Sequence, residues 1–189
     1  MCRVVRALGE PAGEDVDVVD AVGSALIIPF LAAEKIVANW RESLDPSAAL
    51  GVPAHITIHF PWVHADRVDQ SVLRDLEEMV AAVPSFEVVF ERIGWFDREV
   101  LWLDPDPKEP FISMAAESAD RWPDHPQYGG QFETVVPHLT VGIGHADELD
   151  GAEARLAVVL PIHDVVTQVW WITRTGAEKW VVRPTLDLG

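Results

Sequence analysis

The chain has 189 residues, 49% of them hydrophobic and eight of them Trp, which is enough for one folded domain or two joined lobes and excludes a disordered chain. Its 14 Lys and Arg against 31 Asp and Glu give a formal net charge of −17. A long nucleic acid needs several phosphate-neutralising cations on one face, so this charge disfavours such a partner. A small anion bound in a local pocket is compatible with it.

The single cysteine, Cys2, excludes an intrachain disulfide and a multi-cysteine zinc site. Arg3 and Arg6 are not followed by the apolar run of a signal peptide. The longest apolar stretch, residues 25–33, is interrupted by Pro29 and is far shorter than the roughly 18 residues that a membrane span needs. We therefore expect a cytoplasmic protein without a membrane segment.

Hydrophobic periodicity and turn residues predict the elements of the first half. Residues 1–20, which are acidic and contain Gly and Pro, are expected to form a loosely ordered leader, and residues 21–189 a single bilobal domain. Asp69 or Ser71 caps one helix and Pro84 ends it. In chain order we expect a strand at 24–30, a helix at 31–42, turns at 45–53, an alternating strand at 54–60, a helix at 71–83, and strands at 86–95 and 100–103.

The second half repeats this order. It predicts a helix at 110–122, a long loop at 123–137, an alternating strand at 138–143, a helix at 148–160, and strands at 165–173 and 180–188 around a turn at Gly176. The two alternating strands begin 83 residues apart. The pattern predicts an α+β, duplicated bilobal fold, in which two antiparallel sheets flank a central groove and helices cover their outer faces.

Both alternating strands contain the triplet His-x-Thr. The first has His55 and Thr57, and the second has His138 and Thr140. Residues i and i+2 of a strand share one face, about 6.6–7 Å apart, so each motif presents an imidazole beside a hydroxyl. The intervening aliphatic residues, such as Ile56 and Leu139, then point into the core.

Paired imidazoles across a groove suit phosphodiester chemistry. One imidazole takes a proton from the attacking oxygen while the other protonates the leaving oxygen, and histidine titrates in the required range. The hydroxyls of Thr57 and Thr140 can donate to the non-bridging phosphoryl oxygens. This arrangement requires neither a metal nor another cofactor, and the two histidines have equivalent sequence contexts.

At these residues the sequence resembles the 2H phosphoesterase superfamily, and within it the bacterial 2′–5′ RNA ligase branch, over about residues 22–189. The segments that carry the resemblance are 51–62, 128–144 and 180–189. The resemblance implies that His55 and His138 are catalytic, that Thr57 and Thr140 bind the phosphate, and that the enzyme opens or forms phosphodiesters with a 2′ linkage.

We therefore expect a metal-independent phosphoesterase acting on 2′,3′-cyclic phosphates or 2′–5′ linked small nucleotides. The net charge and the lack of an Arg or Lys cluster beside either motif in the sequence favour a mononucleotide or short oligonucleotide as partner, and a monomer is expected. The alternative is a non-catalytic nucleotide-binding module that senses AMP-like ligands. An interaction protein with a vestigial groove is a third alternative, which the intact His and Thr residues argue against.

Further candidate groove residues are His59, Tyr128, Trp62 and Arg174. His59 shares the face of His55 in a regular strand, but the two are about 13 Å apart, too far to bind one metal ion, so we expect a partly exposed groove-wall residue. Tyr128, the only Tyr, lies in the loop before the second motif, and Arg174 is a candidate phosphate clamp. Aromatic residues that can stack on a base or belong to the core are Trp62, Trp95, Trp102, Tyr128 and Phe132.

Overall fold

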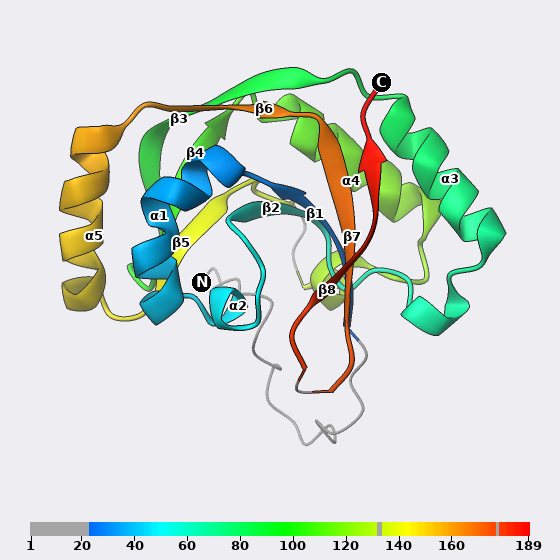
Figure 1. The fold of residues 1–189 in the computed structure, drawn as a ribbon, viewed down its shortest axis with the longest axis horizontal. Helices are drawn as coiled ribbons and strands as arrows, with labels where there is room; N and C mark the ends of the chain where they lie inside the picture. The colour runs from blue at the N-terminus through cyan, green and yellow to red at the C-terminus, as the bar shows by residue number, and fades with distance from the viewer. Residues whose placement is uncertain (1–22, 132–133, 177) are drawn as a thin grey trace.

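The computed structural model describes residues 23–131, 134–176 and 178–189 (Figure 1). The expected leader at residues 1–20 lies outside these residues. The elements are β1 (Gly23–Pro29), α1 (Leu31–Leu44), α2 (Pro46–Ala49), β2 (His55–His59), a 3-10 helix (Ala65–Arg67), α3 (Gln70–Ala81), β3 (Phe86–Phe96), β4 (Val100–Asp106), α4 (Glu109–Arg121), a second 3-10 turn (Gln127–Gly130), β5 (Leu139–Ile143), α5 (Ala146–Val159), β6 (Ile162–Val166), β7 (Gln168–Arg174) and β8 (Val181–Asp187).

The strands form two four-stranded antiparallel sheets, with the orders β2-β1-β7-β8 and β5-β4-β3-β6. We name them the first and the second sheet. Each His-x-Thr motif lies on an edge strand, β2 in the first sheet and β5 in the second, and these two edge strands contact each other. The predicted α+β fold with two antiparallel sheets is confirmed.

The helices divide between the two sheets. In Figure 1, α1 and α5 lie at one end of the molecule and α3 and α4 at the other. Helix α1 packs on β5 and β6, α5 on β3, α3 on β8 and α4 on β2. One large core, with Phe30, Phe90 and Phe111 fully buried in it, joins the helix-covered faces of both sheets. None of the described helices is long and apolar enough to cross a membrane.

The start of α3 shows how local sequence sets an element. The Asp69 carboxylate accepts hydrogen bonds from the backbone N–H groups of Ser71, at 2.8 Å, and Val72, at 3.0 Å. These bonds satisfy two donors that have no partner within the helix. The side chains of Leu76, Met79 and Val80 then form its buried stripe. The predicted cap at Asp69 is confirmed.

One predicted strand is wrong. The expected strand at 165–173 is split at Thr167, where the chain leaves β6 in the second sheet and enters β7 in the first. The Thr167 carbonyl accepts a hydrogen bond from the Leu188 backbone N–H at 2.9 Å, which ties this corner to the end of β8. Neither Gly nor Pro marks the corner, so the sequence carries no turn signal there.

Candidate active site

The first motif lies at the start of β2. His55 lies opposite Pro29 and Thr57 opposite Ile27 on the neighbouring strand β1. The side chains of Ile56 and Ile58, each 1% exposed, point into the main core, as the alternation predicts. His55 and Thr57 therefore share the other face of the first sheet.

The second motif has the same arrangement. His138 directly precedes β5, and Thr140 lies opposite Trp102 of β4. Leu139 and Val141 are fully buried in the main core, while His138 and Thr140 are partly exposed. The motif residues again occupy the sheet face that points away from the main core.

Both motif histidines make the same backbone hydrogen bond. The Nδ1 of His55 lies 2.8 Å from the carbonyl oxygen of Pro53, and the Nδ1 of His138 lies 2.7 Å from that of Val136. A carbonyl only accepts, so each Nδ1 carries the proton and donates it. The neutral ring then presents the lone pair of Nε2, the atom needed to accept a proton from a reactant.

Burial lowers the pKa of both motif histidines. The pKa of His55 falls to about 4 because burial disfavours the imidazolium, and the positive charges of Arg41 and His138 lower it further. The pKa of His138 is lowered by burial as well. Because His138 contributes to the lowered pKa of His55 and strands β2 and β5 contact each other, the fold brings the two motifs together, as the duplicated sequence pattern predicts.

Two aromatic rings hold His138. Phe96 meets the imidazole edge to face at a centroid distance of 5.0 Å, and Trp102 lies 6.0 Å from it. Phe96 and Trp102 stack on each other at 5.0 Å. Gly94 leaves room for the Trp102 ring in this stack, because a Cβ at residue 94 would lie 2.2 Å from that ring. Sequence reasoning missed Phe96, since it stands 42 residues before His138 with no pattern linking them.

Tyr128 joins the first motif from a loop far away in the sequence. Its backbone N–H donates to the Phe60 carbonyl at 2.6 Å, and its hydroxyl forms a hydrogen bond with the side chain of Thr57. Burial raises the pKa of Tyr128 to about 12, so the phenol is protonated at neutral pH. The structure thus brings this predicted groove residue to the His-x-Thr face.

His59 is not a partly exposed groove residue, and that expectation is wrong. Thr57 lies opposite Ile27 but His59 lies opposite Leu26, so β2 carries one extra residue, a bulge, at Ile58. The bulge turns His59 to the core face, where it is 0% exposed. Its ring nitrogens lie 2.7 Å from the Ser118 hydroxyl and 2.6 Å from the His125 carbonyl, and burial lowers its pKa to about 4.

Two other predicted residues lie away from the motifs. Trp62 is 2% exposed and packs edge to face against Trp122, at 5.1 Å, and Trp171, at 5.7 Å, so it belongs to the core. Arg174 lies opposite Gly23, six residues along β1 from the partner of His55, which is about 20 Å of strand. Its Nε donates to the Gly176 carbonyl at 2.8 Å. Phe132 lies outside the described residues.

The structure brings two cations to the face of the second motif. Arg92 of β3 lies opposite Asp104 of β4. Asp104 follows Trp102 by two residues, so the two side chains lie on the same face of β4. The Asp104 carboxylate pairs with Arg92 at 3.0 Å and with Lys108 at 2.7 Å. These cations do not flank the motif in the sequence, because pairing across strands joins residues that the sequence separates, and both are ion-paired with Asp104.

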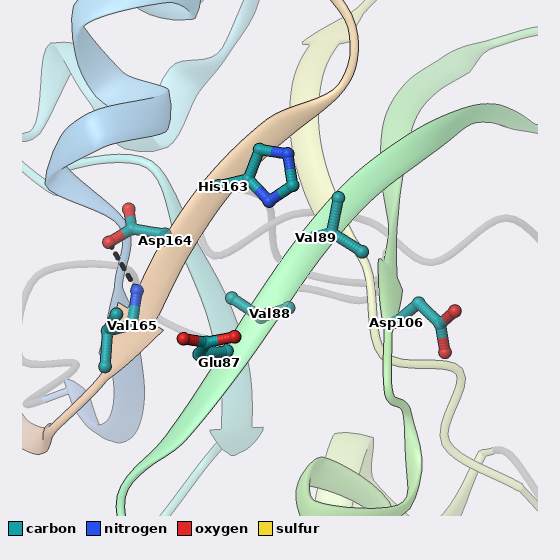
Figure 2. Close-up of a pocket in the computed structure, with 7 residues that line it drawn as sticks. All are labelled: Glu87, Val88, Val89, Asp106, His163, Asp164 and Val165. Carbon is teal, nitrogen blue, oxygen red and sulfur yellow. Dashed lines mark hydrogen bonds between the residues drawn. The ribbon is translucent and has the colours of Figure 1, made fainter.

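A cavity of about 600 Å³ lies elsewhere on the second sheet (Figure 2). It is lined by Glu87, Val88, Val89, Asp106, His163, Asp164 and Val165, none of which is a motif residue. Its three carboxylates would repel a phosphate, so we place the site at the motifs. In the part of the chain that the structure describes, no three His, Cys, Asp or Glu side chains are placed to bind a metal ion.

The two motifs, on contacting edge strands of two antiparallel sheets, agree with the comparison of this chain with known families. The model of the 2′-5′ RNA ligase superfamily matches residues 29–178. The chain belongs to this superfamily. This membership confirms the resemblance to the 2H phosphoesterase superfamily that the two His-x-Thr motifs carry.

Three individual proteins are similar to this chain, one by sequence and two by structure. A Bacillus cereus protein named as a candidate phosphoesterase is 29% identical over 114 residues, which cover 57% of this chain and 60% of that relative. This chain therefore matches less than two thirds of the relative's length. Escherichia coli LigT, solved with 3′-AMP, has a TM-score of 0.53 at 19% identity and covers 88% of this chain and 97% of its own. TT0787 of Thermus thermophilus has a TM-score of 0.49 at 12% identity, covering 87% of this chain and 96% of its own.

Proposed function

We propose that the chain is a metal-independent phosphoesterase that opens 2′,3′-cyclic phosphates or 2′–5′ linkages of small nucleotides with His55 and His138 as acid and base. The observation that carries this proposal is the matched pair of imidazoles, each donating Nδ1–H to the carbonyl two residues before it. Each ring thus presents Nε2 beside a threonine hydroxyl on the same sheet face.

The proposed reaction needs one group that removes a proton from the attacking water and a second group that gives a proton to the leaving ribose oxygen. The neutral imidazole accepts a proton from the attacking water, whose oxygen bonds to phosphorus, while the imidazolium protonates the ribose oxygen whose bond to phosphorus breaks. Without a bound substrate, the rings of His55 and His138 are mainly neutral at neutral pH, because the pKa of each is lowered. A bound phosphate anion favours the imidazolium of an adjacent ring, so the substrate itself helps to supply the acid.

The threonines hold the phosphate in this scheme. The protonated Tyr128 hydroxyl forms a hydrogen bond with the Thr57 side chain and so holds that side chain in place beside the phosphoryl group in this scheme. Thr140 provides the corresponding donor from β5. The nucleoside monophosphate bound to LigT supports a ligand of this size, and Arg92 and Lys108 support a short oligonucleotide as an additional substrate.

The test is hydrolysis of a panel of 2′,3′-cyclic mononucleotides with excess chelator, by the native chain and by His55→Ala and His138→Ala. We expect chelator-resistant turnover with a bell-shaped pH profile, and a fall of about 10² to 10⁴-fold in each variant. His163→Ala, in an exposed position outside the motifs, is the matched control and should retain native turnover. Binding without turnover by the native chain would instead support the AMP-like ligand sensor, and neither binding nor turnover would refute both.

A further inference from the structure

Arg41 is the largest fully buried side chain of the described residues, at 1% exposed. It lies on the buried stripe of α1 together with Ala33 and Val37. Its guanidinium donates to the Asp45 carboxylate at 2.8 and 3.0 Å, to Glu34 at 2.9 Å and to the Ser47 hydroxyl at 3.1 Å. A buried arginine with this many charged and polar partners is held in one position.

The same side chains hold the backbone that leads into the first motif. Both terminal nitrogens of Arg41 donate to the Val52 carbonyl at 3.2 Å. Glu34 accepts a hydrogen bond from the Ala54 backbone N–H at 2.5 Å. Between these two anchored residues lies Pro53, whose carbonyl accepts the Nδ1–H of His55. Arg41 and Glu34 thus anchor the residues on both sides of Pro53. The Pro53 carbonyl in turn sets the tautomer of His55.

Charges around the two motif histidines differ although their backbone hydrogen bonds match. Arg41 and His138 disfavour the imidazolium of His55, and Asp45 favours it. Glu34, which bonds to Arg41 and to Ala54, is the other carboxylate on this side. For His138, burial is the cause of the lowered pKa, and the Val136 carbonyl opposes it. Arg41 thus disfavours the imidazolium of His55, whereas no Arg or Lys of the described residues is among the causes of the lowered pKa of His138.

We propose that Arg41, together with Glu34, is a positioning residue that fixes residues 52–54 and thereby makes His55 the proton acceptor and His138 the proton donor. This inference rests on the proposed two-histidine function. His55 Nε2 takes the proton of the attacking water, the water oxygen bonds to phosphorus, and the bond from phosphorus to the ribose oxygen breaks. That oxygen receives the proton of His138 Nε2, and exchange with solvent returns both rings to their starting forms.

The first experiment measures kcat/KM against pH for the native chain and Arg41→Met. In the variant we expect the acidic limb, which reports His55, to move up by about one pH unit, a tenfold change in proton affinity, because a cation is lost and Asp45 is unopposed. The alkaline limb, which reports His138, should stay in place. Arg121→Met, an exposed residue paired with Glu117 on α4, removes the same charge and should move neither limb.

Three further variants keep the test decisive if Arg41→Met does not fold. Arg41→Lys keeps the charge but cannot make the forked contacts, so the acidic limb should stay while kcat falls. Glu34→Gln retains an acceptor for Ala54 N–H and Glu34→Ala does not, so only the alanine variant should lose about tenfold in kcat. Equal activity of these two variants would refute the role of Glu34.

An NMR titration of the imidazole groups distinguishes a failure of this inference from a failure of the proposed function. We expect His55 to titrate at a lower pH than His138 in the native chain. The difference between their two pKa values should become smaller in Arg41→Met, whether or not nucleotides are turned over. A folded Arg41→Met with both titrations unchanged would overturn the positioning role. Movement of the alkaline limb alone would overturn the assignment, because His55 would then be the donor. Absence of turnover with the expected titration would refute the phosphoesterase proposal alone.

Discussion

Replacing His59 by Gln tests the structural role of this histidine, which lies four residues after the motif histidine His55. The His59 ring donates Nε2–H to the His125 carbonyl, and because burial lowers its pKa the ring is neutral at neutral pH and accepts the Ser118 hydroxyl hydrogen through Nδ1. A glutamine side chain offers a donor and an acceptor but does not titrate. We therefore expect the variant to fold, to keep its turnover, and to lose part of the pH dependence of its stability.

The size of this effect follows from the pKa of His59. Burial lowers it from 6.5 to about 4, so the unfolded chain binds the proton more tightly than the folded chain. The stabilisation from neutral His59 is therefore complete above pH 6.5 and is lost as the pH falls towards 4. At 1.36 kcal/mol for each pKa unit, the folded state should lose about 3 kcal/mol over this range through His59 alone.

The assay is urea unfolding at a series of pH values between 8 and 4 for the native chain and His59→Gln. His55 and the carboxylates titrate in both proteins, so the difference between the two curves isolates His59. His163→Gln is the matched control, since that side chain is exposed and its replacement should leave the native pH dependence intact. Parallel curves for the native chain and His59→Gln would refute the reasoning.

Three further predictions test the placement of single side chains. Tyr128→Phe removes the hydroxyl that bonds to Thr57 and should lower kcat/KM about tenfold with unchanged thermal stability; an unchanged rate would exclude it from the site. Trp62→Ala should cost about 3–5 kcal/mol in urea unfolding because a core aromatic is lost, and a stability loss below 1 kcal/mol would contradict its burial. Arg174→Ala should leave KM and kcat unchanged in steady-state assays, and a raised KM would contradict its distance from His55.

Local patterns were sufficient to predict the motif faces. Alternation around His55 and His138 determines which side chains share a face, and it correctly places Ile56, Ile58, Leu139 and Val141 in the core. The repeated order of elements predicts that two similar sheets present the two motifs. These predictions succeed because they depend on strand geometry over two to four residues, which a sequence states directly.

The remaining features depend on pairing between distant segments. The bulge at Ile58 arises from the register of β2 against β1, and it alone turns His59 away from His55. The role of Phe96 depends on β3 reaching the second motif. Arg41 did carry a local signal, because a charged residue on the stripe of Ala33 and Val37 must be paired inside the protein, although its partners are not evident from spacing.

The order of the strands has a consequence for biosynthesis. The sheet that carries His55 gains β7 and β8 from residues 168–187, and the sheet that carries His138 gains β3 and β4 from residues 86–106, before the second motif. The nascent chain therefore exposes β1 and β2 on the ribosome until more than a hundred further residues have been made. Cutting the gene between β4 and β5 would not yield two folding halves, because each motif would then lack strands of its own sheet that are encoded on the other side of the cut.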